Sequence, residues 1–294
     1  MITPRTIKWE KRAIPILLFL WTWKLSTTAA IAAKFFPENK LHSVYKLLLA
    51  LKKKGLIGYK YEEYYENFFW VLTDKGFDRI SGKLPYDLFE EGYGSESFSH
   101  DFITTAAHLG DWLLKIPEGC DLFTEQQLRR IVSDQYPSWV PQCKFAQTAK
   151  SYHRPDGYWK INSESTKEVV ALEVERRQQG NERYLAIGRF YASQESLYRV
   201  FWLVPSETKG RNISVKMQKH LKENEDYHNF ILIDDFLKNG WRAKVFMGPD
   251  QNQTITNILS SGKGETMGER GETSPCTLLL DTRKNPITPI NSII

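Results

Sequence analysis

The 294-residue chain is poor in cysteine. Its three cysteines, Cys120, Cys143 and Cys276, are odd in number, far apart, and include no Cys-x-x-Cys pair. This spacing favours neither a disulfide framework nor a structural zinc site. A reducing, cytoplasmic environment fits such cysteine usage best.

The sequence also lacks an apolar run long enough for a membrane span. The stretch KRAIPILLFLWTW, followed by STTAAIAAKF, imitates a secretory signal through its basic flank, apolar run and small residues. Lys24 interrupts the run, however, and the residues beyond it continue a helical pattern. The sequence therefore predicts an intracellular protein with no membrane partner.

No strong excess of either charge is present. The 40 Lys and Arg residues outnumber the 35 Asp and Glu residues by five, and the isoelectric point is near 8.9. A weakly basic chain is compatible with a polyanionic partner without requiring one. Hydrophobic residues make up 41% of the chain, which is enough for the core of one large or two ordinary domains.

Residues 1–82 predict a unit of helices and one hairpin. Apolar residues at helical spacing indicate helices at 12–24, with Pro15 in the first turn, and at about 39–54. STTAAIAAKFF predicts a short helix between them, capped by Ser26 or Thr27. Two β-rich runs, LIGYKYEEYY and FFWVLT, predict the hairpin, and TDKGFDRI resumes a helix.

This order of elements resembles the winged-helix domains of small bacterial regulators, whose third helix often ends in a similar Lys-Lys-Gly-Leu-Ile run. The resemblance covers about residues 5–82 and implies binding to double-stranded DNA. It places three side chains of the third helix near base edges and two lysines at phosphates. The base-edge residues are His42, Ser43 and Lys46, and the phosphate contacts are Lys40 and Lys53.

Two features of this region favour other interpretations. The lysines of the third helix also suit an ordinary solvated helix face. The predicted wing carries Glu62, Glu63 and Glu66, which would repel the phosphates beside a minor groove. The hairpin could therefore serve a protein contact.

Residues 83–99 mix glycine, serine and acidic residues without periodicity, and they predict a linker. Residues 100–249 alternate helical and strand-like segments, which predicts a mixed sheet with helices on its faces and an α/β (α+β) fold class. Residues 250–294 are rich in Gly, Ser, Thr and Asn and predict a mobile tail. The segments expected as helices are HDFITTAAHLGDWLLK, TEQQLRRIVSD, NERYLAIGRFYAS and ISVKMQKHLKE, and those expected as strands are SLYRVFWLVP and NFILIDDFLKNGWRAKVFM.

An acidic hairpin within this second domain carries the strongest chemical signal. With residues 162–167 as its loop, Asp156 falls opposite Glu173, and Glu175 projects to the same side as Glu173. Like charges directly opposite one another destabilise a sheet by roughly 0.2–1 kcal/mol. A hard divalent cation, Mg²⁺ or Mn²⁺, would relieve that repulsion. Alternatively the glutamates pair with basic residues on an exposed face, with Arg154, Lys160 and Arg183 as the candidates.

The segments RPDGYW and ALEVERR resemble the Pro-Asp and Glu-x-Lys half-motifs of the PD-(D/E)xK nuclease superfamily. A winged helix ahead of such a core resembles, more narrowly, the replication-relaxation proteins of plasmids and other mobile elements. The resemblance implies a restriction-endonuclease-type domain in which Asp156 and Glu173 bind the metal. It adds the backbone carbonyl of Val174 as a ligand and Glu125 as a further acid.

Glu175 departs from this pattern, because it occupies the position of the usual lysine. Two hypotheses follow. In the first, Asp156, Glu173 and Glu175 form the catalytic site of a metal-dependent DNA endonuclease. In the second, the protein is a non-enzymatic regulator or replication accessory factor, and the nuclease-like core serves dimerisation, DNA binding or contact with a replication or mobilisation partner.

Overall fold

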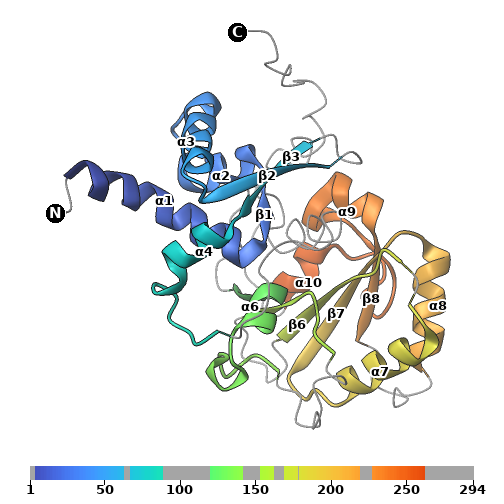
Figure 1. Cartoon of the computed structure of the whole chain (residues 1–294). Coiled ribbons are helices and arrows are strands. Elements are labelled where there is room, and N and C mark those ends of the chain that lie inside the picture. Colours follow the sequence, from blue (N-terminus) through green and yellow to red (C-terminus); the bar gives the residue numbers. More distant parts are fainter. Residues whose placement is uncertain are drawn as a thin grey trace.

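The computed structural model describes residues 4–62, 67–88, 120–141, 153–161, 169–177, 179–218 and 227–261. These residues form a mixed α/β protein with a three-stranded and a six-stranded sheet. Figure 1 shows the N-terminal elements beside the larger sheet, with α1 and α6 close to one another. Within the described ranges, no helix is both long enough and apolar enough to cross a membrane.

The N-terminal unit has the predicted order of helices and hairpin. Its elements are α1 (Pro4–Trp23), β1 (Leu25–Ser26), α2 (Thr28–Phe35), α3 (Leu41–Lys53), β2 (Ile57–Glu62), β3 (Asn67–Leu72) and α4 (Asp74–Ser81). The strands form an antiparallel sheet in the order β1-β3-β2. Thr27 caps α2 by accepting a hydrogen bond from the Ala30 N–H, and Gly55, with a φ of 71°, follows the end of α3.

The first helix is longer than predicted. It begins at Pro4 instead of residue 12, so Pro15 lies inside the helix and not in its first turn. The residues from Pro4 to Arg12 are mostly polar, and their sequence carries no hydrophobic period that would reveal a helix. From Ala13 onward the buried side of α1, together with Val44, Leu48 and Leu51 of α3, forms the core of this unit.

The second sheet has the order β4-β5-β6-β7-β8-β9, in which β6, β7 and β8 are parallel and the outer pairings are antiparallel. Its strands are β4 (Cys120–Thr124), β5 (Gly157–Ile161), β6 (Val169–Val174), β7 (Leu197–Val204), β8 (His228–Leu232) and β9 (Val245–Met247). The associated helices are α6 (Glu125–Arg130), α7 (Asn181–Ala192), α8 (Glu207–Gln218), α9 (Ile233–Asn239) and α10 (Ile255–Ser261).

Helices α7 and α8 connect the parallel strands and pack on one face of the sheet. The Tyr191 ring of α7 contacts the His228 ring of β8 at a centroid distance of 5.7 Å. On the opposite face, Trp241, which follows α9, contacts Trp159 of β5 at 6.0 Å. Figure 1 shows α7 and α8 on one side of the sheet and α9 and α10 on the other. The predicted mixed sheet with helices on both faces is therefore confirmed.

The acidic hairpin has the predicted register along its paired strands. Gly157 faces Leu172, and Lys160 faces Val169. Asp156 precedes the paired segment, and its N–H donates to the Leu172 carbonyl at 2.9 Å. The end of β6 therefore lies beside Asp156.

Two predictions about the C-terminal part are wrong. The run expected to form only strands contains α9, which begins directly after β8 with Asp234 and Asp235 in its first turn, where acidic side chains stabilise a helix. The predicted tail does not start at residue 250, because Asp250 is buried and α10 packs Ile255 and Ile258 into the core. Polar neighbours conceal these few core positions in the sequence.

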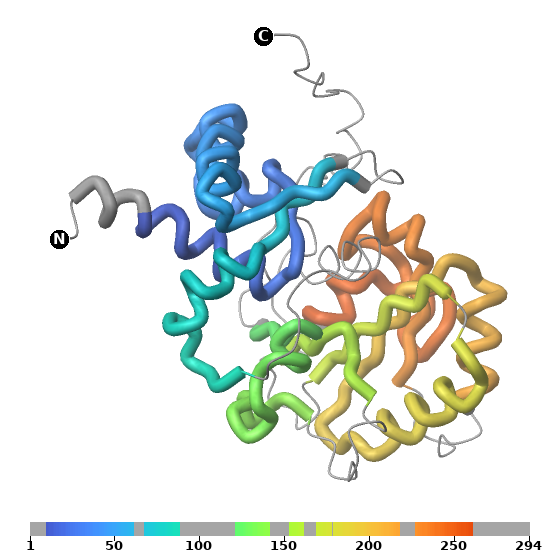
Figure 2. The backbone as a smooth tube through the Cα atoms, viewed as in Figure 1, coloured from blue at the N-terminus to red at the C-terminus, as the bar shows by residue number. Residues whose placement is uncertain are grey.

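Several predicted segments lie outside the described residues. They are the helix expected at 100–115, most of the linker, the hairpin loop at 162–167 and the chain beyond residue 261. Figure 2 follows the backbone of the described part from the N-terminal unit in blue, through α6 in green, to the C-terminal elements in orange. An isolated bridge between Leu88 and Ile131 connects the end of the first unit to the segment after α6.

Candidate active site at the ends of β5 and β6

Three carboxylates lie where β5 begins and β6 ends. Asp156 directly precedes β5, Glu173 is the second-last residue of β6, and Glu175 is the first residue after β6. Their exposed fractions are 8%, 7% and 8%, respectively. Acids are rarely so buried unless they are paired or bind a cation, so this placement calls for a chemical explanation.

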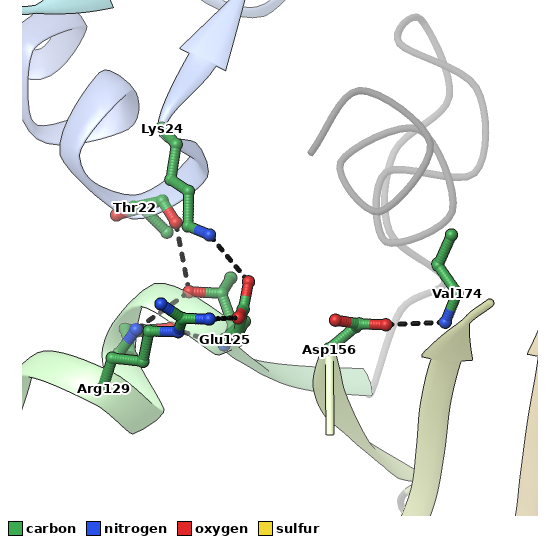
Figure 3. A network of polar contacts seen from close by, with 8 residues as sticks. Thr22, Lys24, Glu125, Arg129, Asp156 and Val174 are labelled. Atoms are coloured by element: carbon green, nitrogen blue, oxygen red, sulfur yellow. Dashed lines mark hydrogen bonds and ion pairs between the residues drawn. The ribbon is translucent and has the colours of Figure 1, made fainter. Parts of the chain in front are cut away.

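Asp156 is fixed by the backbone of the neighbouring strand. Its Oδ2 accepts a hydrogen bond from the Val174 N–H at 2.6 Å, as Figure 3 shows. A charged acceptor makes this a strong hydrogen bond. This bond holds the Asp156 carboxylate at the end of β6. Its donor, Val174, is the residue between Glu173 and Glu175.

Glu173 is held by two side chains of other elements. Its Oε1 lies 2.5 Å from Nε2 of His153 and accepts a hydrogen bond from the Tyr191 hydroxyl of α7. Burial raises the pKa of the Glu173 carboxyl; the neighbouring His153 opposes this rise, and the charge of Asp156 adds to it. Burial and the charge of Glu173 in turn raise the pKa of Tyr191 well above its ordinary value. His153 and Tyr191 therefore orient the Glu173 carboxylate, burial removes it from water, and the charge of Asp156 repels it.

Glu175 has a different set of neighbours. Its N–H donates to the Leu203 carbonyl at 2.9 Å, so the backbone still follows the parallel strand β7. Burial raises the pKa of the Glu175 carboxyl, while the positive charge of Lys209 and a hydrogen bond from Tyr184 oppose the rise. Burial likewise lowers the pKa of the Lys209 amine, and the charge of Glu175 opposes that change. The strongest cationic influence on Glu175 thus comes from α8.

Glu125 adjoins Asp156 through the backbone, since its N–H donates to the Asp156 carbonyl at 3.3 Å. Its carboxylate, however, lies 2.7 Å from Lys24 Nζ and 2.6 Å from an Arg129 guanidinium nitrogen. Figure 3 shows this carboxylate directed toward Lys24, away from Asp156. Glu125 therefore forms part of the contact between the N-terminal unit and the second sheet, and its carboxylate does not join that of Asp156.

That contact has a second hydrogen bond. The Thr124 hydroxyl donates to the carbonyl of Thr22 at 3.1 Å and also accepts from the Gln127 N–H as the cap of α6. Lys24 has a positive φ of 63°, an uncommon conformation for a residue with a side chain. The chain thus turns sharply after α1 at the residue that pairs with Glu125.

The donor set suits a hard divalent cation. Asp156 and Glu173 supply only oxygen, which Mg²⁺ and Mn²⁺ prefer, and a cation would relieve the repulsion that acts on Glu173. In the ranges that the structure describes, no three His, Cys, Asp or Glu side chains stand together in a group that could hold an ion. The residues fit such an ion as a pair of carboxylates beside the Val174 backbone.

The predicted DNA-binding residues lie on the surface of the N-terminal unit. All five are exposed, at the start of α3 or on the sides of α3 that face away from the buried Val44 and Leu48. They are Lys40, His42, Ser43, Lys46 and Lys53. The lysines give this side of the helix a positive charge that is open to a polyanion.

Sequence reasoning missed three neighbours of the carboxylates. His153 contacts Glu173, and its position three residues before Asp156 was the available signal. Tyr191 and Lys209 come from α7 and α8, and nothing local in their sequence marks them. Of the alternative basic partners, Arg183 acts on Glu175 but less strongly than Lys209 does.

Comparison of the chain with protein-family models, with curated proteins and with solved structures found no match in any of the three. Functional inference therefore depends on the chain's own residues and their arrangement.

Proposed function

We propose that the protein binds double-stranded DNA through its N-terminal unit and hydrolyses a phosphodiester bond at Asp156, Glu173 and Glu175. The observation that carries this proposal is the burial of three acids at adjoining ends of β5 and β6, under α7. The order of elements around them, and of helices and hairpin in residues 4–81, supports the resemblance to a PD-(D/E)xK core behind a winged helix.

Asp156, Glu173 and the Val174 carbonyl would hold Mg²⁺ or Mn²⁺. When bound, the cation would activate water and stabilise the leaving oxygen of the phosphodiester. The other residues would orient the two carboxylates. The Val174 N–H fixes Asp156, and His153 and Tyr191 fix Glu173. Such outer contacts to metal-binding side chains typically change affinity or activity 10–100-fold when removed.

Lys209 offers a replacement for the missing lysine of the Glu-x-Lys half-motif. It comes from α8 and acts on Glu175, the residue that occupies the lysine position. Its ammonium group supplies the positive charge that a phosphodiester acquiring negative charge requires. The charge of Glu175 would favour the protonated form of Lys209, which burial disfavours.

The N-terminal unit would position the duplex. The exposed lysines of α3 neutralise phosphates, and the Lys24–Glu125 and Thr22–Thr124 contacts connect this unit to the strands that carry the acids. DNA bound at α3 is therefore held at a fixed place relative to β5 and β6.

Binding through α3 is tested by changing Lys40 and Lys46 together to glutamate. Because binding driven by phosphate neutralisation depends on charge and salt, affinity for a duplex at low salt should fall by about tenfold or more. Lys83→Glu with Lys238→Glu makes the same change in net charge at exposed positions outside α3 and is the matched control. If both double variants lost the same affinity for the duplex, DNA binding could not be assigned to α3.

Cleavage is tested with a series at Glu175. If Glu175 favours the charged form of Lys209, then Glu175→Gln and Lys209→Met should each reduce metal-dependent nicking of plasmid DNA while duplex binding persists. Glu175→Lys separates the two hypotheses. A working site should lose activity in this variant, whereas a relic that lacks only the lysine should gain weak cutting.

The second candidate function is a regulator or accessory factor without catalysis. The presence of Glu175 at the position of the usual lysine favours it. On this hypothesis Glu175→Gln relieves repulsion with Glu173 and leaves the fold equally or more stable.

A further inference from the structure

The exposed large hydrophobic side chains of the described residues are concentrated at one place. Of six such side chains, five belong to α3 and the β2–β3 hairpin, and the sixth, Val215, lies on α8. The five are Leu41, Leu49, Tyr59, Tyr61 and Phe68. Single exposed apolar residues need no explanation, but a contiguous group of them indicates a binding surface.

The aromatic members form a ladder on one face of the hairpin. The register places Tyr59 opposite Trp70 and Tyr61 opposite Phe68, so all four side chains share that face. Phe68 lies 5.3 Å from Tyr59 and 4.9 Å from Tyr61 between ring centroids, and Tyr59 lies 5.7 Å from Trp70. Tyr59, Tyr61 and Phe68 are 43%, 51% and 44% exposed. Three adjoining rings are thus held in place with about half of their surface open.

One flank of α3 continues this surface. The Tyr45 ring lies 6.1 Å from Trp70, and Lys52 Nζ lies 3.9 Å from the centre of the Tyr59 ring. Leu49 follows Tyr45 by four residues and precedes Lys52 by three, so it belongs to the same flank. We call the surface formed by this flank and the three exposed rings the aromatic surface.

Exposed lysines border the aromatic surface. They come from α3 and from the turn after it, and they are Lys46, Lys52, Lys53 and Lys54. The chain's acids in this region, Glu62, Glu63 and Glu66, follow the last ring position of β2. Positive charge therefore accompanies the rings on the α3 side.

We propose that the aromatic surface binds single-stranded DNA by stacking its bases on Tyr59, Tyr61 and Phe68. Bases of a duplex are covered by their neighbours, so exposed rings have no base face to stack on there. Unpaired bases present that face, and lysines alongside such rings neutralise the backbone in single-strand binding sites. A second copy of the chain would instead bring two sets of the same lysines together.

The two nucleic-acid surfaces of α3 are adjacent. His42, Lys46 and Lys53 lie on the side opposite the core, whereas Tyr45, Leu49 and Lys52 lie on the flank beside the hairpin. This arrangement suits DNA in which a duplex adjoins an unpaired strand. Single-strand binding itself requires neither cleavage nor duplex binding by the protein.

The test measures binding of the full chain to a fluorescein-labelled 12-nucleotide oligothymidylate and to a 12-base-pair duplex by anisotropy. Stacking on one ring accounts for about a fivefold or larger change in affinity per base. Tyr59→Ala with Tyr61→Ala removes two rings and should therefore weaken single-strand binding by about 25-fold or more, and duplex binding much less. Tyr59→Phe with Tyr61→Phe keeps the ring faces and should bind within about twofold of wild type. Val215→Ala is the matched control for loss of an exposed apolar side chain.

Several outcomes would overturn the proposal. They are absence of single-strand binding in the wild type, unchanged binding in the double alanine variant, and equal losses for single strand and duplex. Self-association abolished by the same variant, with no effect on the oligonucleotide, would assign the surface to a second copy. Tyr61→Ala alone removes the most exposed ring and serves if a thermal melt shows that the double variant does not fold.

Discussion

Replacing Asp250 by alanine should destabilise the whole second sheet, although the sequence around Asp250 resembles a tail. In the structure Asp250 accepts two hydrogen bonds from Arg199, at 2.5 and 3.1 Å, and one from the Asn229 side chain at 2.7 Å. Its own N–H donates to the Asn229 side-chain oxygen at 3.2 Å. These bonds connect the turn before α10 to the neighbouring strands β7 and β8.

The magnitude follows from the burial of these groups. Removing one partner of a buried ion pair costs about 3–5 kcal/mol, because the other charge stays buried and unpaired. The Arg199 side chain is 20% exposed and can recover some hydration, so the lower end of that range, about 3 kcal/mol, is expected for Asp250→Ala. Removal of Glu207 from its exposed pair with Arg211 is the control, and it should cost no more than about 0.5 kcal/mol.

Urea unfolding, followed by far-UV circular dichroism at neutral pH, measures both variants. Although burial alone would raise the pKa of Asp250, the bonds from Arg199 and Asn229 and the guanidinium charge lower it below 3.8. The stabilisation by the ionised acid is therefore present above pH 3.8 and is lost as the pH falls through the lower pKa of the folded state. An Asp250→Ala variant as stable as the Glu207→Ala control at pH 7 would refute the assignment of Asp250 to the core.

Two further predictions concern buried charges. Burial lowers the pKa of His228 to about 3, so unfolding takes up a proton below pH 6.5, and the wild type should lose about 2 kcal/mol more stability than His228→Gln between pH 8 and pH 5 in urea titrations. Equal losses in the two proteins would mean that His228 is not buried as a neutral ring. Lys24→Ala should cost about 2 kcal/mol, because Lys24 and Glu125 are only 11% and 10% exposed, whereas Arg129→Ala should cost about 0.5 kcal/mol, since Arg129 is 38% exposed. Thermal melts that rank these two variants in the opposite order would contradict the contact between the two units.

Local patterns predicted much of the fold. The helices of the N-terminal unit, its hairpin and the register of the acidic hairpin follow from spacing, caps and strand alternation, which depend on nearby residues. Pro4, the actual start of α1, and α9 were missed because their hydrophobic period is short or absent. The folded segment from Asp250 was missed for another reason, since its partners Arg199 and Asn229 lie 51 and 21 residues away.

In the candidate site too, local sequence predicted some residues, and tertiary packing brought in the others. Asp156, Glu173 and Glu175 come from one hairpin, so their proximity could be inferred from its register alone. Tyr191 and Lys209 reach the acids only because α7 and α8 pack on that face of the sheet. The engagement of Glu125 by Lys24 required knowledge of how the two units meet, which no local pattern encodes.

The most direct measurement is nicking of supercoiled plasmid by the purified full chain in Mg²⁺ or Mn²⁺, with Asp156→Asn and a chelator as controls. Asparagine keeps the shape of Asp156 and can still accept the hydrogen bond from the Val174 N–H, but it lacks the charge that a cation requires. The wild type should nick the plasmid, and both the chelator and Asp156→Asn should abolish nicking while duplex binding persists. A wild type that binds the duplex but nicks with neither metal, or an Asp156→Asn variant that nicks as fast as the wild type, would contradict catalysis at this site.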